Sequence, residues 1–108
     1  MNNLVYVCSP LRGDVKQNIE NAKIYSRTVT ELGYIPITPH LYFTTFLDPT
    51  SVSDNELGIS MGLAVLPLCG ELWVFGDRIS ENMRTEIELA DKLSIFVADM
   101  RTKKYLKD

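Results

Sequence analysis

The fold is decided by the stretch Leu4-Val5-Tyr6-Val7-Cys8-Ser9-Pro10-Leu11-Arg12-Gly13-Asp14. Its first five residues are apolar and rich in β-formers, the pattern of a strand that is buried on both faces of a parallel sheet. A cluster of turn-forming residues follows at 9–13. Asp14 then begins a helix, with Gln17 three residues later as in a capping box. The stretch therefore predicts a strand, a turn and a helix in direct succession.

The same alternation continues along the rest of the chain. Apolar residues recur every three or four positions after Asp14, up to a natural helix stop at Gly33. Further strands are predicted at 34–38, 71–76 and 94–98, and further helices at 56–66 and 80–92. Residues 39–54 are predicted to form a long connection, and Pro36 places the second strand near an edge. The order predicts a three-layer α/β domain with right-handed crossovers around a parallel sheet of four or five strands.

Length and composition bound the classes of protein that remain. A chain of 108 residues that is 45% hydrophobic and 23% charged is predicted to form one domain, residues 1–108, with a real core. No apolar run approaches the roughly 20 residues of a membrane span, and no signal peptide is visible, so we expect no membrane association. Cys8 and Cys69 have apolar neighbours and no metal-ligand spacing, which indicates buried thiols of a cytoplasmic protein.

The charge distribution argues against one class of partner. The net charge is −3, but four of the 11 basic residues and one of the 14 acidic residues lie at 101–108, so the remainder carries −6. Such a body has no basic face for duplex nucleic acid, although a small anion at one local site stays compatible. The basic tail is interpreted as a solvated terminus.

The predicted helix at 56–66 is apolar on nearly every side, because no charged residue lies between Leu57 and Gly70. A helix of this kind must be covered on two sides. In a chain of this size the second cover could be another subunit, so we expect a homodimer or a larger homo-oligomer.

Two predicted loops lie at the carboxyl ends of strands, where open parallel sheets bind ligands. In the first, free N–H groups at a helix start, the Arg12 guanidinium and close backbone approach at Gly13 could hold an anion. The loop has neither a Walker nor a GxGxxG pattern. The alternative is a plain turn with a solvent-exposed arginine.

The second loop, 76–80, leads into a helix on which Glu86 lies on the same inward face as Met83 and Ala90. An inward glutamate is uncommon unless something uses it. The alternatives are an ion pair with Arg12 or a cap on the backbone. His40 is the only histidine and has no partners at ligand spacing, so it is interpreted as structural and no metal site is predicted.

Four segments in this order resemble the nucleoside 2-deoxyribosyltransferase-like superfamily, and most closely its small, uncharacterised bacterial and phage branch: 6–14, 36–40, 69–76 and 80–86 with Ala90. The resemblance implies a Rossmann-like, flavodoxin-like domain that binds a nucleoside or nucleotide and acts on its N-glycosidic bond. It implies no metal or organic cofactor. It also implies a dimer or larger assembly in which one subunit completes the site of another.

The resemblance assigns roles to particular residues. Glu86 matches the catalytic nucleophile. Substrate-binding roles fall on the first strand and on both loops, at Tyr6, Ser9, Arg12, Gly13, Ser80 and Asn82. The sequence departs from the family where Asn82 replaces a glycine, and where the segment 58–63 lacks the aspartate of the helix before the third strand. Asp54 or Glu56 could take the place of that aspartate.

The leading hypothesis is an N-glycosidase or deoxyribosyltransferase in which Glu86 attacks the anomeric carbon and forms a glycosyl-enzyme intermediate. The alternative is a non-catalytic nucleotide-binding or sensor module of the same fold, and a third reading is a structural oligomer with a vestigial cleft. The first two require residues 9–13 and Glu86 to converge on one pocket.

Overall fold

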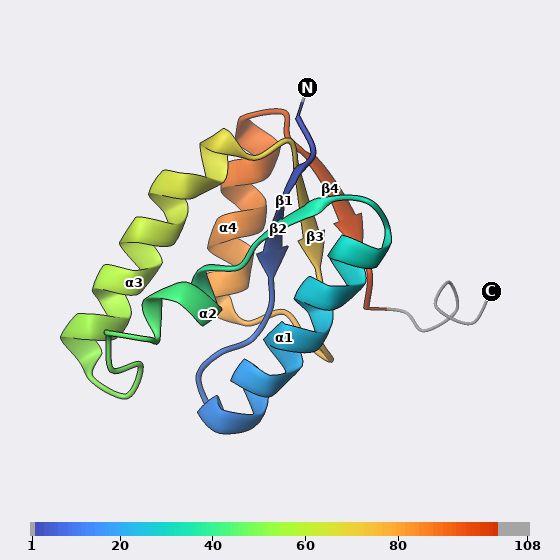
Figure 1. Cartoon of the computed structure of the whole chain (residues 1–108). Helices are drawn as coiled ribbons and strands as arrows, with labels where there is room; N and C mark the ends of the chain where they lie inside the picture. The colour runs from blue at the N-terminus through green and yellow to red at the C-terminus, as the bar shows by residue number, and fades with distance from the viewer. Residues whose placement is uncertain (1, 102–108) are drawn as a thin grey trace.

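The computed structural model describes residues 2–101, in which strands and helices alternate (Figure 1). The strands are β1 (Leu4–Cys8), β2 (Ile35–Ile37), β3 (Glu71–Val74) and β4 (Phe96–Asp99). The helices are α1 (Val15–Glu31), α2 (Pro39–Phe43), α3 (Val52–Val65), the short 3-10 helix η1 (Leu66–Leu68) and α4 (Glu81–Lys92). The basic tail, apart from Arg101, lies outside the described residues.

The strands of the described residues form a parallel, four-stranded sheet in the order β2-β1-β3-β4. This confirms the predicted α/β class, and β2 with its Pro36 is an edge strand as expected. Cys8 at the end of β1 stands opposite Val74 at the end of β3. The loops that follow these two strands therefore leave the sheet at the same rim.

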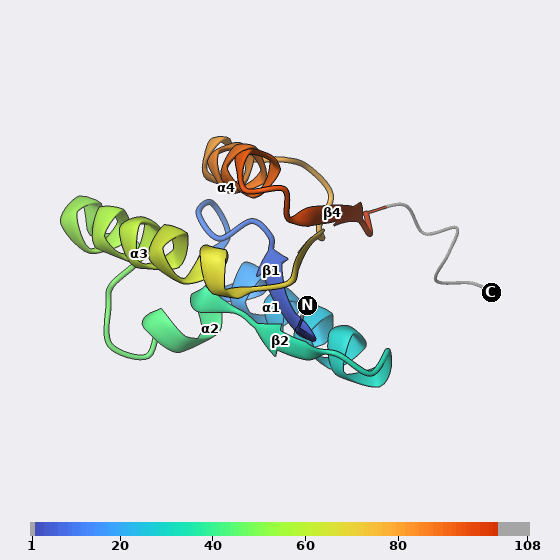
Figure 2. The same ribbon diagram turned by 90° about the horizontal axis from the view of Figure 1, so that it is seen from above.

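Helices cover both faces of the sheet, which gives the three layers expected (Figure 2). Because side chains alternate along a strand, β1 contributes to two cores. Val5 and Val7 pack toward α1, in the cluster that contains Val29. Tyr6 and Cys8 face the opposite way and join the cluster of Leu66 of η1 and of Met83 and Ala90 of α4.

The two helices that follow the rim begin at capping residues that the sequence predicts. The Asp14 carboxylate accepts a hydrogen bond from Gln17 N at 3.2 Å, so this charge is engaged at the start of α1. The Ser80 hydroxyl accepts from Met83 N at 3.3 Å and fixes the start of α4. Both caps set the helix ends beside the predicted loops.

The structure corrects the prediction for residues 39–54. This connection contains α2, because Pro39 presets the first helical turn and Thr38 stands before it as N-cap. Helix α3 begins at Val52, four residues before the predicted start, because the Ser51 hydroxyl accepts from Asp54 N. Strand β4 begins two residues later than predicted, after Ser94 with its positive φ of 58°. Within residues 2–101, no helix has the length and apolar character needed to cross a membrane.

Candidate functional site

A cavity of about 410 Å³ opens at the carboxyl rim of the sheet. Its wall is formed by the end of β1 and the loop after it, by α2 and the segment that joins it to α3, by the first half of α3, and by the start of α4. The cavity therefore lies where open parallel sheets bind ligands. Of the predicted stretch 9–13, Ser9, Leu11 and Arg12 line this cavity together with Glu86, whereas Gly13 does not.

Glu86 lies in the second turn of α4, and its side chain is buried with 7% of the residue surface exposed. Tyr6 Oη donates a hydrogen bond to Glu86 Oε2 at 2.6 Å. Cys8 Sγ donates to Glu86 Oε1 at 3.2 Å. Because Tyr6 and Cys8 are two residues apart on one strand, both reach the same carboxyl group. We call these three residues the carboxyl cluster.

Burial controls the ionisation of the carboxyl cluster. It raises the pKa of Glu86 to about 7, although the hydrogen bonds from Tyr6 and Cys8 act in the opposite direction. Burial, together with the nearby Glu86 charge, also raises the pKa of Tyr6 and that of Cys8 far above their ordinary values. Both residues therefore stay protonated as donors, while Glu86 is divided between its acid and carboxylate forms at neutral pH. A carboxyl group poised in this way inside a cavity is typical of functional sites.

Ser9 is buried with 1% exposed, and its hydroxyl has no hydrogen-bond partner within the described residues. Its carbonyl lies 2.8 Å from His40 Nε2, and since a carbonyl can only accept, that nitrogen carries the proton. Burial lowers the pKa of His40, so the ring is neutral at pH 7. His40 thus has the structural role expected of it, and it also lines the cavity. The Ser9 hydroxyl oxygen is itself buried, so it is an unsatisfied polar group beside the cavity.

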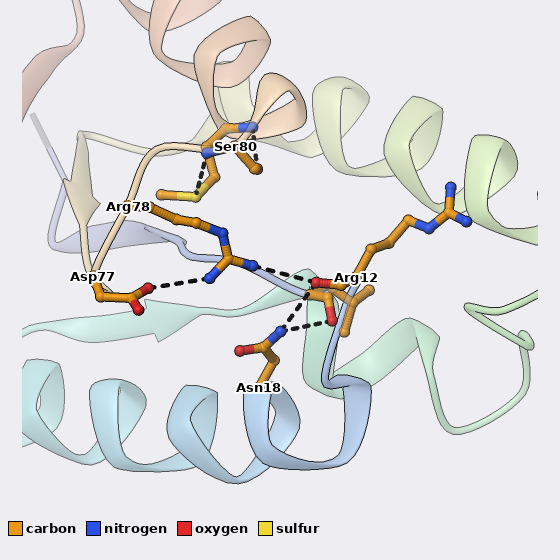
Figure 3. A network of polar contacts seen from close by, with 7 residues as sticks. Arg12, Asn18, Asp77, Arg78 and Ser80 are labelled. Atoms are coloured by element: carbon orange, nitrogen blue, oxygen red, sulfur yellow. Dashed lines mark hydrogen bonds and ion pairs between the residues drawn. The ribbon is translucent and has the colours of Figure 1, made fainter.

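The backbone of the first loop is held from two sides (Figure 3). The Arg12 carbonyl accepts from Asn18 Nδ2 at 3.2 Å and from Arg78 Nη2 at 3.4 Å. Arg78 in turn pairs with Asp77 at 3.1 Å. The Arg12 guanidinium extends away from this network, and among residues 2–101 it has no hydrogen-bond or ion-pair partner. The alternative of an Arg12–Glu86 ion pair is therefore wrong, since Glu86 is bonded to Tyr6 and Cys8.

The remaining predicted site residues are divided between the cavity wall and its support. Ser80 and Asn82 line the cavity at the start of α4, as do Tyr6, Ser9, Arg12 and Glu86. Gly13 lies outside the wall and adopts a φ of +101°, so its place in the structure is the shape of the turn. Asp54 and Glu56, the predicted substitutes for the missing aspartate, both line the cavity.

Sequence reasoning missed several residues of the site. Cys8 does not line the cavity but bonds to Glu86, a role that its interpretation as a buried thiol does not include, although its spacing from Tyr6 places the two on one face. Phe43, Leu47 and Ile59 line the cavity. Phe43 and Leu47 lie in the stretch 39–54, which is predicted only as a connection. Ile59 lies in the predicted helix 56–66, where an apolar residue by itself gives no sign of a ligand site. In the described part of the chain, no cluster of three or more histidine, cysteine or acidic residues could hold a metal ion.

The sheet order defines a Rossmann-like α/β domain, and its cavity lies at the carboxyl ends of the strands. The chain belongs to a family described as a domain of unknown function, DUF7768, which matches residues 3–100. Its fold is similar to that of the 2-deoxyribosyltransferase from the psychrotolerant bacterium Bacillus psychrosaccharolyticus. The TM-score is 0.68 at 13% identity, over 89% of this chain and 70% of that chain.

No curated protein matches the sequence. The structural similarity confirms the deoxyribosyltransferase-like fold that the sequence resembles. A similarity at 13% identity shows the fold and does not show which reaction, if any, this chain catalyses.

Proposed function

We propose that this protein binds a nucleoside or nucleotide in the rim cavity and breaks or transfers its base–sugar bond, with Glu86 as the nucleophile. One observation carries the proposal: a buried carboxyl group in the cavity wall, held by Tyr6 and Cys8, is poised to ionise at neutral pH. The similarity of the fold to a 2-deoxyribosyltransferase supports the same substrate class.

In the proposed reaction, the Glu86 carboxylate attacks the anomeric carbon as positive charge develops on the sugar. The bond between that carbon and the base nitrogen breaks, its electron pair goes to the base, and the base takes up a proton. Asp54 and Glu56 line the cavity and are the proposed sources of that proton. Water or a second base then attacks the same carbon, its proton passes to the carboxylate that supplied the first one, and the bond from the sugar to Glu86 breaks. This chemistry needs no metal or organic cofactor.

The 5′ end of the sugar is proposed to lie against the first loop. There the exposed Arg12 guanidinium is available to a 5′-phosphate group, and the buried, unpartnered Ser9 hydroxyl would contact the 5′ end after turning toward the cavity. Ser80 and Asn82 would contact the sugar, and Gly13 would keep the turn in shape. Tyr6 lines the cavity, and its hydrogen bond would hold the Glu86 carboxyl group in place beside the substrate.

The alternative is a nucleotide-binding or sensor module without turnover. Two observations favour it. The segment 58–63, of which Gly58 and Ile59 line the cavity, has no carboxylate, and a pKa of about 7 leaves much of Glu86 protonated at neutral pH. A protonated Glu86 is no nucleophile, but it could donate a hydrogen bond to a sugar hydroxyl.

A screen of nucleosides and nucleoside monophosphates separates these two functions. Free base is measured by chromatography, and binding by the shift of the melting temperature. Release of base from at least one compound supports the enzyme. Binding without release supports the module, and the absence of both contradicts the proposed ligand class.

We also propose that α3 forms the interface of a homodimer or larger assembly. In Figure 1 this helix is a flank of the molecule, and its side chains include Leu57, 49% exposed, while Leu68 in η1 is 67% exposed. Light scattering should show more than one subunit, and Leu57→Glu should yield monomers. A monomeric protein at high concentration would contradict this interface.

The free, buried thiols of Cys8 and Cys69 support a cytoplasmic location.

A further inference from the structure

Helix α3 packs against the carboxyl cluster at a glycine. Gly62 is the buried residue within α3. A Cβ atom built there would lie 2.7 Å from Tyr6 Oη, which is closer than atoms of this kind approach, and 3.8 Å from the side chain of Pro39. The space that a side chain would need at Gly62 is therefore occupied by the hydroxyl of Tyr6.

This hydroxyl has little freedom to move aside. Tyr6 is fully buried, and its Oη is 2.6 Å from Glu86 Oε2. It thus lies between the α3 backbone on one side and the α4 carboxyl group on the other. A side chain added at Gly62 would therefore displace the Tyr6 hydroxyl and disturb its hydrogen bond to Glu86.

We propose that Gly62 is a positioning residue: its lack of a side chain lets the Tyr6 hydroxyl stay against α3 and hydrogen-bonded to Glu86. The consequence for catalysis rests on the proposed function, but the contact itself does not. The ionisable side chains bonded to Glu86 are Tyr6 and Cys8, while the α3 acids Asp54 and Glu56 line the cavity nearer the start of that helix.

Gly58, one turn earlier on α3, provides the matched control. A Cβ atom there would lie 3.8 Å from Leu47 Cδ1, which is an ordinary contact. Alanine is the better helix former at either position, so propensity alone does not explain a glycine within α3. At position 62 the nearby Tyr6 hydroxyl explains why a glycine is needed. At position 58 no contact with Tyr6 is found.

The test compares Gly62→Ala and Gly58→Ala in the natural protein and in a Tyr6→Phe background. The readouts are the melting temperature and the pKa of Glu86, followed by carbon NMR of glutamate-labelled protein and assigned with Glu86→Gln. Gly62→Ala should raise the pKa of Glu86, because the bond from Tyr6 lowers it, and should reduce the melting temperature by about 4 °C or more. Gly58→Ala should leave the pKa of Glu86 unchanged.

The Tyr6→Phe background separates positioning from simple packing. With the hydroxyl removed, Gly62→Ala should neither change the pKa of Glu86 nor reduce the melting temperature. An equal loss in both backgrounds would overturn the proposal, as would an unchanged pKa in the single variant. If Gly62→Ala alone does not fold, a folded double variant supports the proposal and an unfolded one overturns it. Neither readout needs turnover, so the outcome is independent of whether base release is found.

Discussion

The two walls of the cavity are built differently. The inner wall comes from β1 and α4, and its centre is the buried, hydrogen-bonded pair Tyr6 and Glu86. The outer wall comes from residues 39–59, where α2, a connection and the start of α3 meet. This region also carries exposed apolar side chains such as Phe46 and Val52, at 58% and 65%. The inner wall is part of the core, whereas the outer wall is largely surface.

This difference in burial suits the inner wall to bond cleavage and the outer wall to ligand recognition. A nucleophile needs a fixed position and a controlled pKa, and both follow from burial between a central strand and a capped helix. Recognition of a particular base or sugar needs side chains that can differ without damage to the core, which is the property of the outer wall. We therefore expect changes on the inner wall to affect bond cleavage, and changes on the outer wall to affect binding.

The largest effect is expected from Glu86→Gln, which keeps the shape of the inner wall and removes the nucleophile. Base release should fall at least about a thousandfold, while binding of the ligand persists. Glu88→Gln is the matched control, because Glu88 is an exposed residue on the same helix and should leave base release unchanged. Equal rates for the Glu86→Gln variant and the natural protein would remove this residue from the reaction.

The inner wall should also make the free energy of unfolding depend on pH. The pKa of Glu86 is raised from 4.5 to about 7 on folding, so between these values the folded state keeps a proton that the unfolded state has lost. Its contribution should therefore fall by about 3 kcal/mol as the pH rises from about 4.5 to about 7, and stay level above. Urea unfolding of the natural protein and of Glu86→Gln should diverge over this range. Parallel profiles would show that folding does not raise the pKa of Glu86.

Arg12 lines the cavity from the loop after β1, and its removal tests the phosphate hypothesis. Arg12→Gln should weaken binding of a nucleoside monophosphate about tenfold, since a charge-assisted hydrogen bond to an exposed guanidinium is lost. Binding of the matching nucleoside should be unaffected. The measurement is calorimetric titration of both ligands. Arg27→Gln, an exposed change on α1, controls for the loss of charge. Equal weakening for both ligands would mean that Arg12 does not contact the phosphate.

The smallest effect is expected from the outer wall. Phe43 lines the cavity, whereas its neighbour Tyr42 lies outside this wall and is 66% exposed. Phe43→Ala should weaken binding about fivefold through lost contact with a base, and Tyr42→Ala should not. The same titrations measure both variants. If the two variants bind alike, the base does not lie against α2.

The inner wall was predictable because its signals are local. The apolar run of β1 fixed the first strand, and the caps at Asp14 and Ser80 placed the ends of both rim helices. The inward position of Glu86 followed from helical spacing. The hydrogen-bond partners of Glu86 were not predictable from the sequence. Only the structure shows that its carboxyl group meets Tyr6 and Cys8 of β1 and not Arg12.

The outer wall was not predictable for a physical reason. Helix α2 spans five residues and has no side-chain cap, so its sequence has little helical signal beyond Pro39. The start of α3 consists of weak helix formers such as Val52 and Ser53, so the prediction places the helix start too late and does not use Ser51 as its N-cap. Gly62 had no meaning until the position of the Tyr6 hydroxyl was known.

The central claim is that the carboxyl group of residue 86 attacks the sugar. The most direct measurement is the mass of the peptide containing Glu86, taken from protein quenched in acid during turnover of a nucleoside or nucleotide. We expect this peptide to carry the sugar on Glu86, and the corresponding peptide of Glu86→Gln to carry none. Base release with the sugar attached to a different residue would contradict the claim.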